Sequence, residues 1–328
     1  MCHEIGFFVV AGHGIDDRLV DDVFSLMETF FALDVSEKEH IDKRRSPHFR
    51  GWESVGSEFT NNRVDLREQI DIWSEYESVE DRETSSAGDE DVGAPYRRLL
   101  GPNQWMPDDV LAGQRELTLR WMDELAGVAD EILELLALGL GLDPSFFRSF
   151  FGDRPMSLTK MIHYPPTPPG EAGVNPHHDT GFLTLLAPGP VAGLQVINPA
   201  GDWIDVPSLP GTFVVNLGEM LQAMTGNYFV ATPHRVVAAS ERLSAAYFHG
   251  PSLDARLAPI DLDSRFSDAV AASPRHAAAG FMASAEETDA GVADMASGRR
   301  ADTYGAQLWN YFARSYPENM ALHHSDLA

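Results

Sequence analysis

The spacing of apolar residues predicts helices in the first part of the chain and short strands in its middle. Between residues 115 and 140, apolar side chains recur every three or four positions, which is typical of a helix with one buried face. The same spacing follows Asp16, whose carboxylate can cap a helix. Residues 5–10 are mostly β-branched or aromatic and predict a strand. We expect residues 1–150 to form a mostly helical N-terminal region that packs on the core.

From Met156 onward the apolar period falls to two. Strands are expected at residues 157–164, 182–186, 193–197, 203–206, 212–216, 228–231, 234–237 and 243–248, separated by Pro, Gly and Asn turns. Many short strands at close spacing indicate an antiparallel sandwich or barrel, so residues 151–255 are the expected β core. The chain that follows is rich in alanine, and residues 256–328 predict a helical C-terminal region with an amphipathic helix at 304–315.

Charge and composition limit the partners of the protein. The 328-residue chain has 50 acidic and 24 basic residues, a formal net charge of −26. Nucleic acids and anionic membranes are bound through basic surfaces, and this chain is strongly acidic. We therefore expect neither of them as a partner. No apolar run reaches membrane-spanning length, and the first residues lack the basic segment of a signal peptide. Because Cys2 is the single cysteine, no intrachain disulfide can form, and we expect a cytoplasmic protein.

Three residues of the expected β core, His177, Asp179 and His234, form a candidate metal site. His177 and Asp179 are two positions apart, so on a strand both side chains would point to one face. Two imidazoles and one carboxylate, with further positions open, are typical of a non-haem Fe(II) site that activates O₂. His178 would point to the opposite face and is expected to be a neighbour. Alternatively, residues 174–176 form a turn, which would leave His177 and Asp179 on the surface.

Arg242 and Ser244 form a second candidate site. They are also two positions apart and would share a strand face. A guanidinium group and a hydroxyl are well suited to hold a carboxylate. In a chain of this negative charge, an anionic ligand would need such a basic anchor. The alternative is an ordinary surface arginine beside Glu241.

Several motifs of the chain occur in one known family, in the same order. They are residues 6–14 (GFFVVAGHG), 163–166 (HYPP), 176–186 (PHHDTGFLTLL), 193–196 (GLQV), 203–207 (WIDVP), 210–222, 232–236 (TPHRV) and 242–244 (RLS). By these motifs the chain resembles the isopenicillin N synthase-like branch of the Fe(II)/2-oxoglutarate-dependent oxygenases, from residue 5 to about residue 251. Members usually have a further N-terminal segment, so the N-terminal region of this chain is expected to be shortened.

The resemblance implies a mainly β protein with flanking helices, built on a double-stranded β-helix, or jelly roll. It implies that His177, Asp179 and His234 bind Fe(II) and leave positions for the cosubstrate 2-oxoglutarate and for O₂. The implied reaction is the oxidation of a small-molecule substrate, by hydroxylation or desaturation, with release of succinate and CO₂. The resemblance also implies a monomer, the usual state of family members.

The resemblance assigns roles to other residues as well. Arg242 and Ser244 would hold the distal carboxylate of 2-oxoglutarate, and Tyr164 would reach the same cosubstrate. An equal alternative for Tyr164 is a core aromatic with a satisfied hydroxyl. Glu68 matches a position where the family's N-terminal half approaches the substrate, and contact with the substrate is its functional interpretation. Residues 75–93 predict a solvated loop, with a lid over the site as the alternative.

Other functions remain open from the sequence. Relatives in this branch include enzymes that fragment 2-oxoglutarate to ethylene and oxidases that do not use 2-oxoglutarate but keep the Arg-x-Ser motif. From different classes, a non-redox zinc hydrolase would accept the same three ligands, and a non-catalytic binding module would share the fold. The zinc interpretation lacks the usual His-Glu-x-x-His motif and gives Arg242 no role. A binding module would normally have lost a metal ligand.

Overall fold

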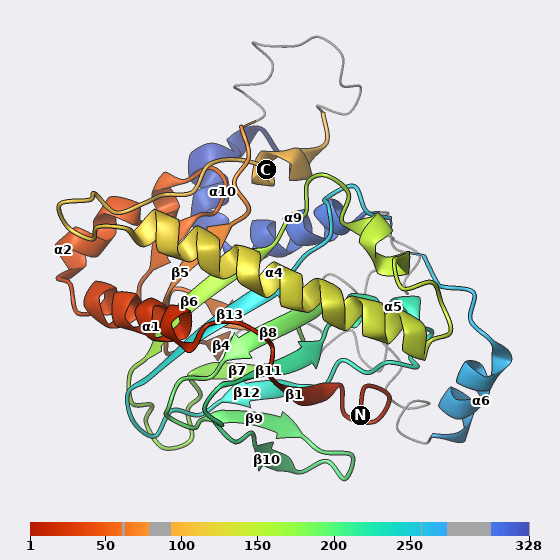
Figure 1. The fold of residues 1–328 in the computed structure, drawn as a ribbon. Helices are drawn as coiled ribbons and strands as arrows, with labels where there is room; N and C mark the ends of the chain where they lie inside the picture. The colour runs from red at the N-terminus through yellow and green to blue at the C-terminus, as the bar shows by residue number, and fades with distance from the viewer. Residues whose placement is uncertain (61–62, 79–92, 257, 274–302, 328) are drawn as a thin grey trace.

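The computed structural model describes residues 1–60, 63–78, 93–256, 258–273 and 303–327. Its strands form two antiparallel sheets and a short hairpin (Figure 1). The larger sheet has seven strands in the order β1 (Phe7–Ala11), β11 (Thr212–Leu217), β8 (Leu183–Ala187), β13 (Arg242–His249), β6 (Leu158–Tyr164), β5 (Glu68–Trp73) and β2 (Gly51–Glu53). The smaller sheet has four, in the order β10 (Trp203–Asp205), β9 (Leu194–Ile197), β12 (His234–Val236) and β7 (Val174–His177). The hairpin pairs β3 (Phe59–Thr60) with β4 (Arg63–Val64).

The two sheets pack face to face and enclose the interior of the fold. Alternate residues of each strand point inward, so that Ile162 and Tyr164 of β6 share one buried cluster with Val174 of β7 and Val236 of β12. Hydrophobic contact between these inner faces holds the sheets together. Of the two architectures that the strand pattern predicts, an antiparallel sandwich or a barrel, the structure has the sandwich.

Helices cover the outer face of the larger sheet, where α1 (Asp17–Phe31) and α4 (Gln114–Gly139) pack across it (Figure 1). The carboxylate of Asp16 caps α1 by accepting a hydrogen bond from the Arg18 amide at 3.0 Å. The described residues also form the α-helices α2 (Val35–Lys38), α5 (Glu219–Met224), α6 (Ser264–Ala272), α9 (Tyr304–Ser315) and α10 (Pro317–His323). Short 3₁₀ turns occur at Glu39–Ile41, Lys43–Arg45, Pro95–Leu99, Phe146–Phe150 and Ser325–Leu327. Within the ranges described above, no helix combines the length and apolar character needed to cross a membrane.

The helices predicted at residues 115–140 and 304–315 are confirmed as α4 and α9. The strand predicted at residues 228–231 is wrong. There the Tyr228 amide donates to the Thr225 carbonyl at 3.1 Å and the Phe229 amide to the Thr225 hydroxyl at 3.0 Å. These bonds turn the backbone after α5, so these two amides are not available for a sheet.

Residues 1–150 contain the predicted helices, α1 and α4, and the strand predicted at residues 5–10, which is β1. Their strands β1, β2 and β5 belong to the larger sheet, where β1 pairs with β11 and β5 pairs with β6. The N-terminal region therefore completes the core sheet as well as covering it. The division into regions at residues 150 and 255 stays a prediction, and most of the predicted loop at 75–93 lies outside the described residues.

Candidate functional site

The two histidines of the candidate metal site lie opposite each other on neighbouring strands. His177 of β7 pairs in register with His234 of β12, and their ring centroids are 4.2 Å apart. Each Nδ1 contacts a backbone carbonyl, that of Asn175 at 2.9 Å for His177 and that of Thr232 at 3.2 Å for His234. A carbonyl can only accept a hydrogen bond, so both Nδ1 atoms carry the proton and both Nε2 atoms are available as ligands. Residues 174–177 are strand, not the turn considered as an alternative.

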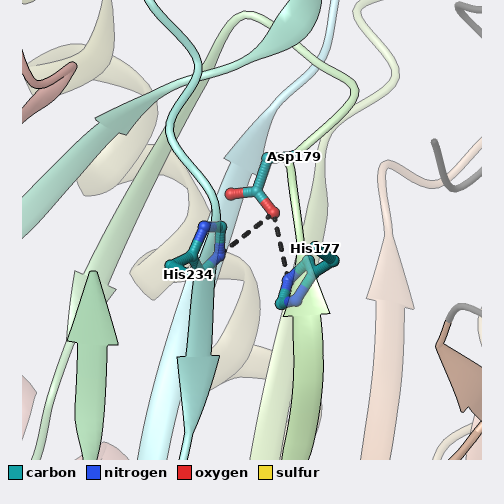
Figure 2. A group of neighbouring side chains, drawn as sticks. All are labelled: His177, Asp179 and His234. Carbon is teal, nitrogen blue, oxygen red and sulfur yellow. Dashed lines mark ion pairs between the residues drawn. The ribbon is translucent and has the colours of Figure 1, made fainter. Parts of the chain in front are cut away.

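Asp179 lies close to both histidines but is not part of strand β7. β7 ends at His177, so the predicted shared strand face is wrong, and Asp179 comes from the loop that follows. Its Oδ1 lies 3.6 Å from Nε2 of His177 and 3.6 Å from Nε2 of His234 (Figure 2). The ligand atoms of the three residues all lie within 4.8 Å of one another. One metal ion can be bound by all three.

The larger sheet fixes the orientation of Asp179. Its Oδ2 accepts hydrogen bonds from Oγ1 of Thr184 on β8 at 2.5 Å and from Nδ2 of Asn216 on β11 at 2.6 Å. Oδ1 therefore faces the two imidazoles. Sequence reasoning missed both supporting residues, because no spacing along the chain connects either of them with Asp179.

The protonation states also suit a metal. Burial lowers the pKa of His177, and burial together with the neighbouring His177 lowers the pKa of His234 to about 4. Burial acts to raise the pKa of Asp179, but the imidazoles and the hydrogen bonds from Thr184 and Asn216 outweigh it and lower that pKa. At neutral pH the site thus holds two neutral imidazoles and one carboxylate. These are the forms that bind metal ions.

We expect Asn216→Ala to weaken Fe(II) binding by roughly 10- to 100-fold, because partners that orient a metal ligand commonly contribute this much. The substitution would free Asp179 to rotate away from the histidines. Anaerobic calorimetric titration with Fe(II) measures the effect. Asn198→Ala, the same change in a turn between β9 and β10, is the control. Equal affinities of the two variants would contradict the assigned role of Asn216.

The second candidate site lies on β13 and faces the same interior. Arg242 pairs in register with Tyr164, and Ser244 pairs with Ile162, which belongs to the inner core. Nη1 of Arg242 donates to Oγ of Ser244 at 3.0 Å, and Nε donates to the Val191 carbonyl at 3.2 Å. The guanidinium carbon lies 5.0 Å from the centre of the Tyr164 ring. The shared strand face predicted from the spacing of Arg242 and Ser244 is therefore present.

The charge of Arg242 has no counterpart in the part of the chain that the structure describes. The residue is only 2% exposed, and burial lowers its pKa. Among the described residues, no carboxylate forms an ion pair with it. A buried, unpaired guanidinium is costly, and a ligand carboxylate would remove that cost. The arrangement fits the distal carboxylate of 2-oxoglutarate, and it contradicts the alternative of a surface arginine.

Glu68 lies on the other side of the sheet. It pairs in register with His163, the neighbour of Tyr164, and therefore faces the helices and not the interior. Its carboxylate accepts hydrogen bonds from Lys38 at 3.0 Å and from Trp52 at 2.9 Å and contacts Nδ1 of His163 at 2.9 Å. Both oxygens of the Glu68 carboxylate are engaged by these contacts. The structure thus opposes the substrate contact considered for Glu68 and indicates a structural role.

Comparison with known proteins agrees with this geometry. The family model of the 2OG-Fe(II) oxygenase superfamily matches residues 155–251. The model called non-haem dioxygenase in morphine synthesis N-terminal matches residues 1–108. A 2-oxoglutarate-dependent dioxygenase, frbJ, from Dothideomycetidae sp. (strain 11243) is 34% identical over 269 residues, which are 79% of this chain and 70% of that protein. A homoarginine-6-hydroxylase from Arabidopsis thaliana is 30% identical, over 80% of this chain and 71% of that protein.

Solved structures show the same fold. A full-length Neurospora crassa protein in complex with alpha-KG and thymine superposes with a TM-score of 0.66 at 25% identity, covering 79% of this chain and 80% of that one. A 2OG-Fe(II) oxygenase family protein from Caulobacter crescentus gives a TM-score of 0.65 at 26% identity, covering 79% and 81%. The predicted jelly-roll core is thereby confirmed. The chain belongs to the 2OG-Fe(II) oxygenase superfamily and is an oxidoreductase that uses Fe(II) and 2-oxoglutarate.

Proposed function

We propose that the protein oxidises a small molecule, by hydroxylation or desaturation, with O₂ and 2-oxoglutarate and with release of succinate and CO₂. One observation carries the proposal. A buried arginine without a carboxylate partner among the described residues shares an interior with two histidines and an aspartate that converge on one point. The three ligands alone suit several metals. The anchor adds a site for an anionic cosubstrate beside them.

In this proposal His177, Asp179 and His234 hold Fe(II) and leave its other positions open. The iron, when bound, supplies the activation of O₂ that no side chain can provide. The protein supplies binding, orientation and exclusion of water. Asp179 and His234 are less than 10% exposed, so a cosubstrate bound beside them is largely shielded from solvent.

Three residues would bind 2-oxoglutarate. Arg242 and Ser244 hold its distal carboxylate, the guanidinium by charge-assisted hydrogen bonds and the hydroxyl by a further one. The Tyr164 ring lies against the guanidinium and restricts its movement, and its hydroxyl is a donor for the same carboxylate. All three side chains are buried, which strengthens the attraction between the guanidinium and the carboxylate.

The substrate screen begins with the compounds named for similar proteins. Relatives include homoarginine-6-hydroxylases, and the Neurospora crassa protein was crystallised with thymine. Homoarginine and thymine differ in charge, and turnover of either would direct the next round of candidates. We expect succinate release to rise several-fold above the substrate-free rate with the right compound only. A 2-oxoglutarate-dependent rate that no compound raises would leave hydroxylation and desaturation unsupported.

The same assay separates the alternative reactions. Ethylene in the headspace without added substrate would identify fragmentation of 2-oxoglutarate. Substrate oxidation without 2-oxoglutarate would identify an oxidase in which Arg242 binds a substrate carboxylate. Hydrolysis supported by Zn(II), with no consumption of O₂, would identify a non-redox zinc enzyme. Binding of the ligand without any turnover would identify a binding module.

We further propose that the protein belongs to the isopenicillin N synthase-like branch, acts in the cytoplasm and is monomeric. The order of motifs from residue 6 to residue 244 supports the branch. The single cysteine, Cys2, suits a reducing compartment. Light scattering of the purified protein tests the oligomeric state, for which a mass of 36.1 kDa is expected. A mass twice as large would contradict the monomer.

A further inference from the structure

The strand that carries His177 contains a bulge. His177 pairs with His234, and Val174 pairs with Val236, with an irregular register between them. One residue separates the paired positions on β12, but two residues, Asn175 and Pro176, separate them on β7. β7 therefore has one residue more than its partner, which is the definition of a β-bulge.

The bulge decides where His177 points. In a regular strand, residues three positions apart face opposite sides. Val174 is part of the inner core, so a regular β7 would direct His177 to the outer face of the smaller sheet. The extra residue reverses this, and Nε2 of His177 lies at the metal site with Asp179. An intact bulge is therefore a condition for metal binding by His177.

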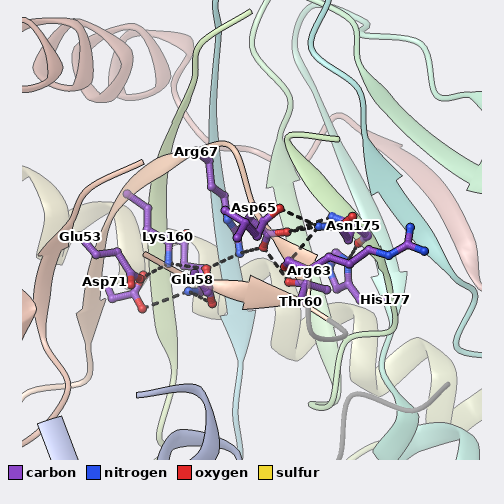
Figure 3. Close-up of polar contacts among 12 residues, drawn as sticks. Glu53, Glu58, Thr60, Arg63, Asp65, Arg67, Asp71, Lys160, Asn175 and His177 are labelled. Carbon is purple, nitrogen blue, oxygen red and sulfur yellow. Dashed lines mark hydrogen bonds and ion pairs between the residues drawn. The ribbon is translucent and has the colours of Figure 1, made fainter. Parts of the chain in front are cut away.

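A side chain from outside the sheet holds the bulge. β7 is an edge strand of its sheet, so among the described residues no strand pairs with the side of its backbone away from β12. Oδ1 of Asp65 accepts hydrogen bonds there from the Asn175 amide at 3.1 Å and from the Asn175 side chain at 2.9 Å (Figure 3). Pro176 has no amide hydrogen. The Asn175 carbonyl is the group that accepts the proton of His177 Nδ1.

Asp65 is itself fixed in place. It is 0% exposed, and its amide donates to the Glu58 carbonyl at 3.0 Å. Its Oδ2 accepts from the Thr60 hydroxyl at 2.7 Å and lies 3.4 Å from Nη2 of Arg67. With both oxygens engaged, the carboxylate cannot turn away from Asn175. A rigid contact thus runs from the β3–β4 hairpin to the backbone of the bulge (Figure 3).

We propose that Asp65 is a positioning residue for the metal ligand His177, acting through Asn175 and the bulge of β7. The inference rests on the proposed metal site. It adds to that site a supporting residue that is distant from the ligands in sequence. Asp65 touches neither the metal nor the cosubstrate in this assignment. Its effect is to hold the carbonyl and the backbone that set the direction of the imidazole ring.

The test is anaerobic titration with Co(II), which substitutes for Fe(II) and whose visible absorption reports the ligand geometry. Wild type is compared with Asp65→Ala, Asp65→Asn, Asn175→Ala and the double variant Asp65→Ala/Asn175→Ala. We expect Asp65→Ala to weaken Co(II) binding by at least about tenfold, as for other groups that orient a metal ligand, and to change the absorption bands. Asp65→Asn keeps an acceptor oxygen and should restore part of the affinity. The double variant should lose less than the sum of the two single losses, because both single changes remove the hydrogen bond between Asp65 and the Asn175 side chain. Asp65→Ala also removes the bond to the Asn175 amide, and Asn175→Ala also removes the side-chain bond to the Val64 carbonyl.

Asp71→Asn is the matched control. Asp71 is also a buried carboxylate, 1% exposed, and it pairs with Lys43 at 2.8 Å and Lys160 at 3.0 Å. None of the hydrogen bonds described for it reaches β7. We expect this variant to lower the melting temperature and to leave the Co(II) affinity and spectrum unchanged. A role of Asp65 in general stability alone would make the two variants behave alike.

The outcomes separate the inference from the proposed function. If wild type binds no Co(II) or Fe(II), the metal site itself is wrong. If wild type binds and Asp65→Ala stays within twofold of it, only the positioning role is overturned. If Asp65→Ala does not fold, the Co(II) affinities and spectra of Asp65→Asn and Asn175→Ala test the positioning role in its place. Unchanged affinity and spectrum in both, or an equal loss in Asp71→Asn, would overturn the inference.

Discussion

Arg242→Ala is expected to weaken 2-oxoglutarate binding by roughly 30-fold to several thousand-fold. This range corresponds to about 2–5 kcal/mol for removal of one partner from a buried, hydrogen-bonded charge pair. The arginine is 2% exposed and has no acidic partner in the described ranges, so a bound carboxylate would become its counter-charge. Its loss would leave that carboxylate buried beside Ser244 and Tyr164 without a cation. The substitution leaves the proposed Fe(II) ligands unaltered.

Absorbance measures this effect directly. Addition of 2-oxoglutarate to the anaerobic Fe(II) protein should produce a charge-transfer band in the visible range, and Arg242→Ala should need a far higher concentration to reach it. Arg235→Ala is the control. That side chain comes from β12 but faces away from the interior, lying 4.3 Å over Trp203 and donating to Gln195 at 2.8 Å. If both variants bind 2-oxoglutarate as wild type does, the anchor assignment is refuted. If wild type binds iron and no band appears on addition of 2-oxoglutarate, an oxidase independent of 2-oxoglutarate becomes the leading interpretation.

His234→Ala is expected to abolish turnover and to weaken Fe(II) binding by more than about 100-fold. That figure is the upper end of the loss seen when a group that only orients a metal ligand is removed, and loss of the ligand itself should exceed it. His234 lies opposite His177 and 3.6 Å from Oδ1 of Asp179, so the substitution leaves one imidazole and one carboxylate. Two protein ligands should hold the metal far less tightly than three.

Calorimetric titration with Fe(II) and succinate release are the two measurements for this variant. His178→Ala is the control for the choice of ligand. It lies between two ligands in sequence but is absent from the group whose ligand atoms converge within 4.8 Å. We expect its Fe(II) affinity to stay within a few-fold of wild type. Activity retained in His234→Ala, or metal binding lost only in His178→Ala, would show that the ligands are assigned incorrectly.

The two candidate sites differ in how far sequence alone could predict them. Arg242 and Ser244 lie within one strand, and their spacing of two placed them on the same face, as the structure has them. The same reasoning failed for His177 and Asp179, because β7 ends at His177. Glu68 was considered for the substrate side, and the pairing of β5 with β6 turns it outward. Asn216 was not considered at all.

The amino-acid sequence by itself determined the local features of this protein. A period of two predicts strands and a period near four predicts helices because each follows from the geometry of the backbone over a few residues. The residue types also indicated the chemistry, since two imidazoles and a carboxylate suit Fe(II) and a guanidinium suits a carboxylate.

Only the tertiary structure decided which of these residues meet. The direction of His177 depends on one extra residue in β7, and that bulge is held by Asp65 from a different part of the chain. The orientation of Asp179 depends on Asn216 from the opposite sheet. Register, bulges and contacts between sheets depend on packing between segments that are far apart in sequence. No pattern within a single strand can contain that information.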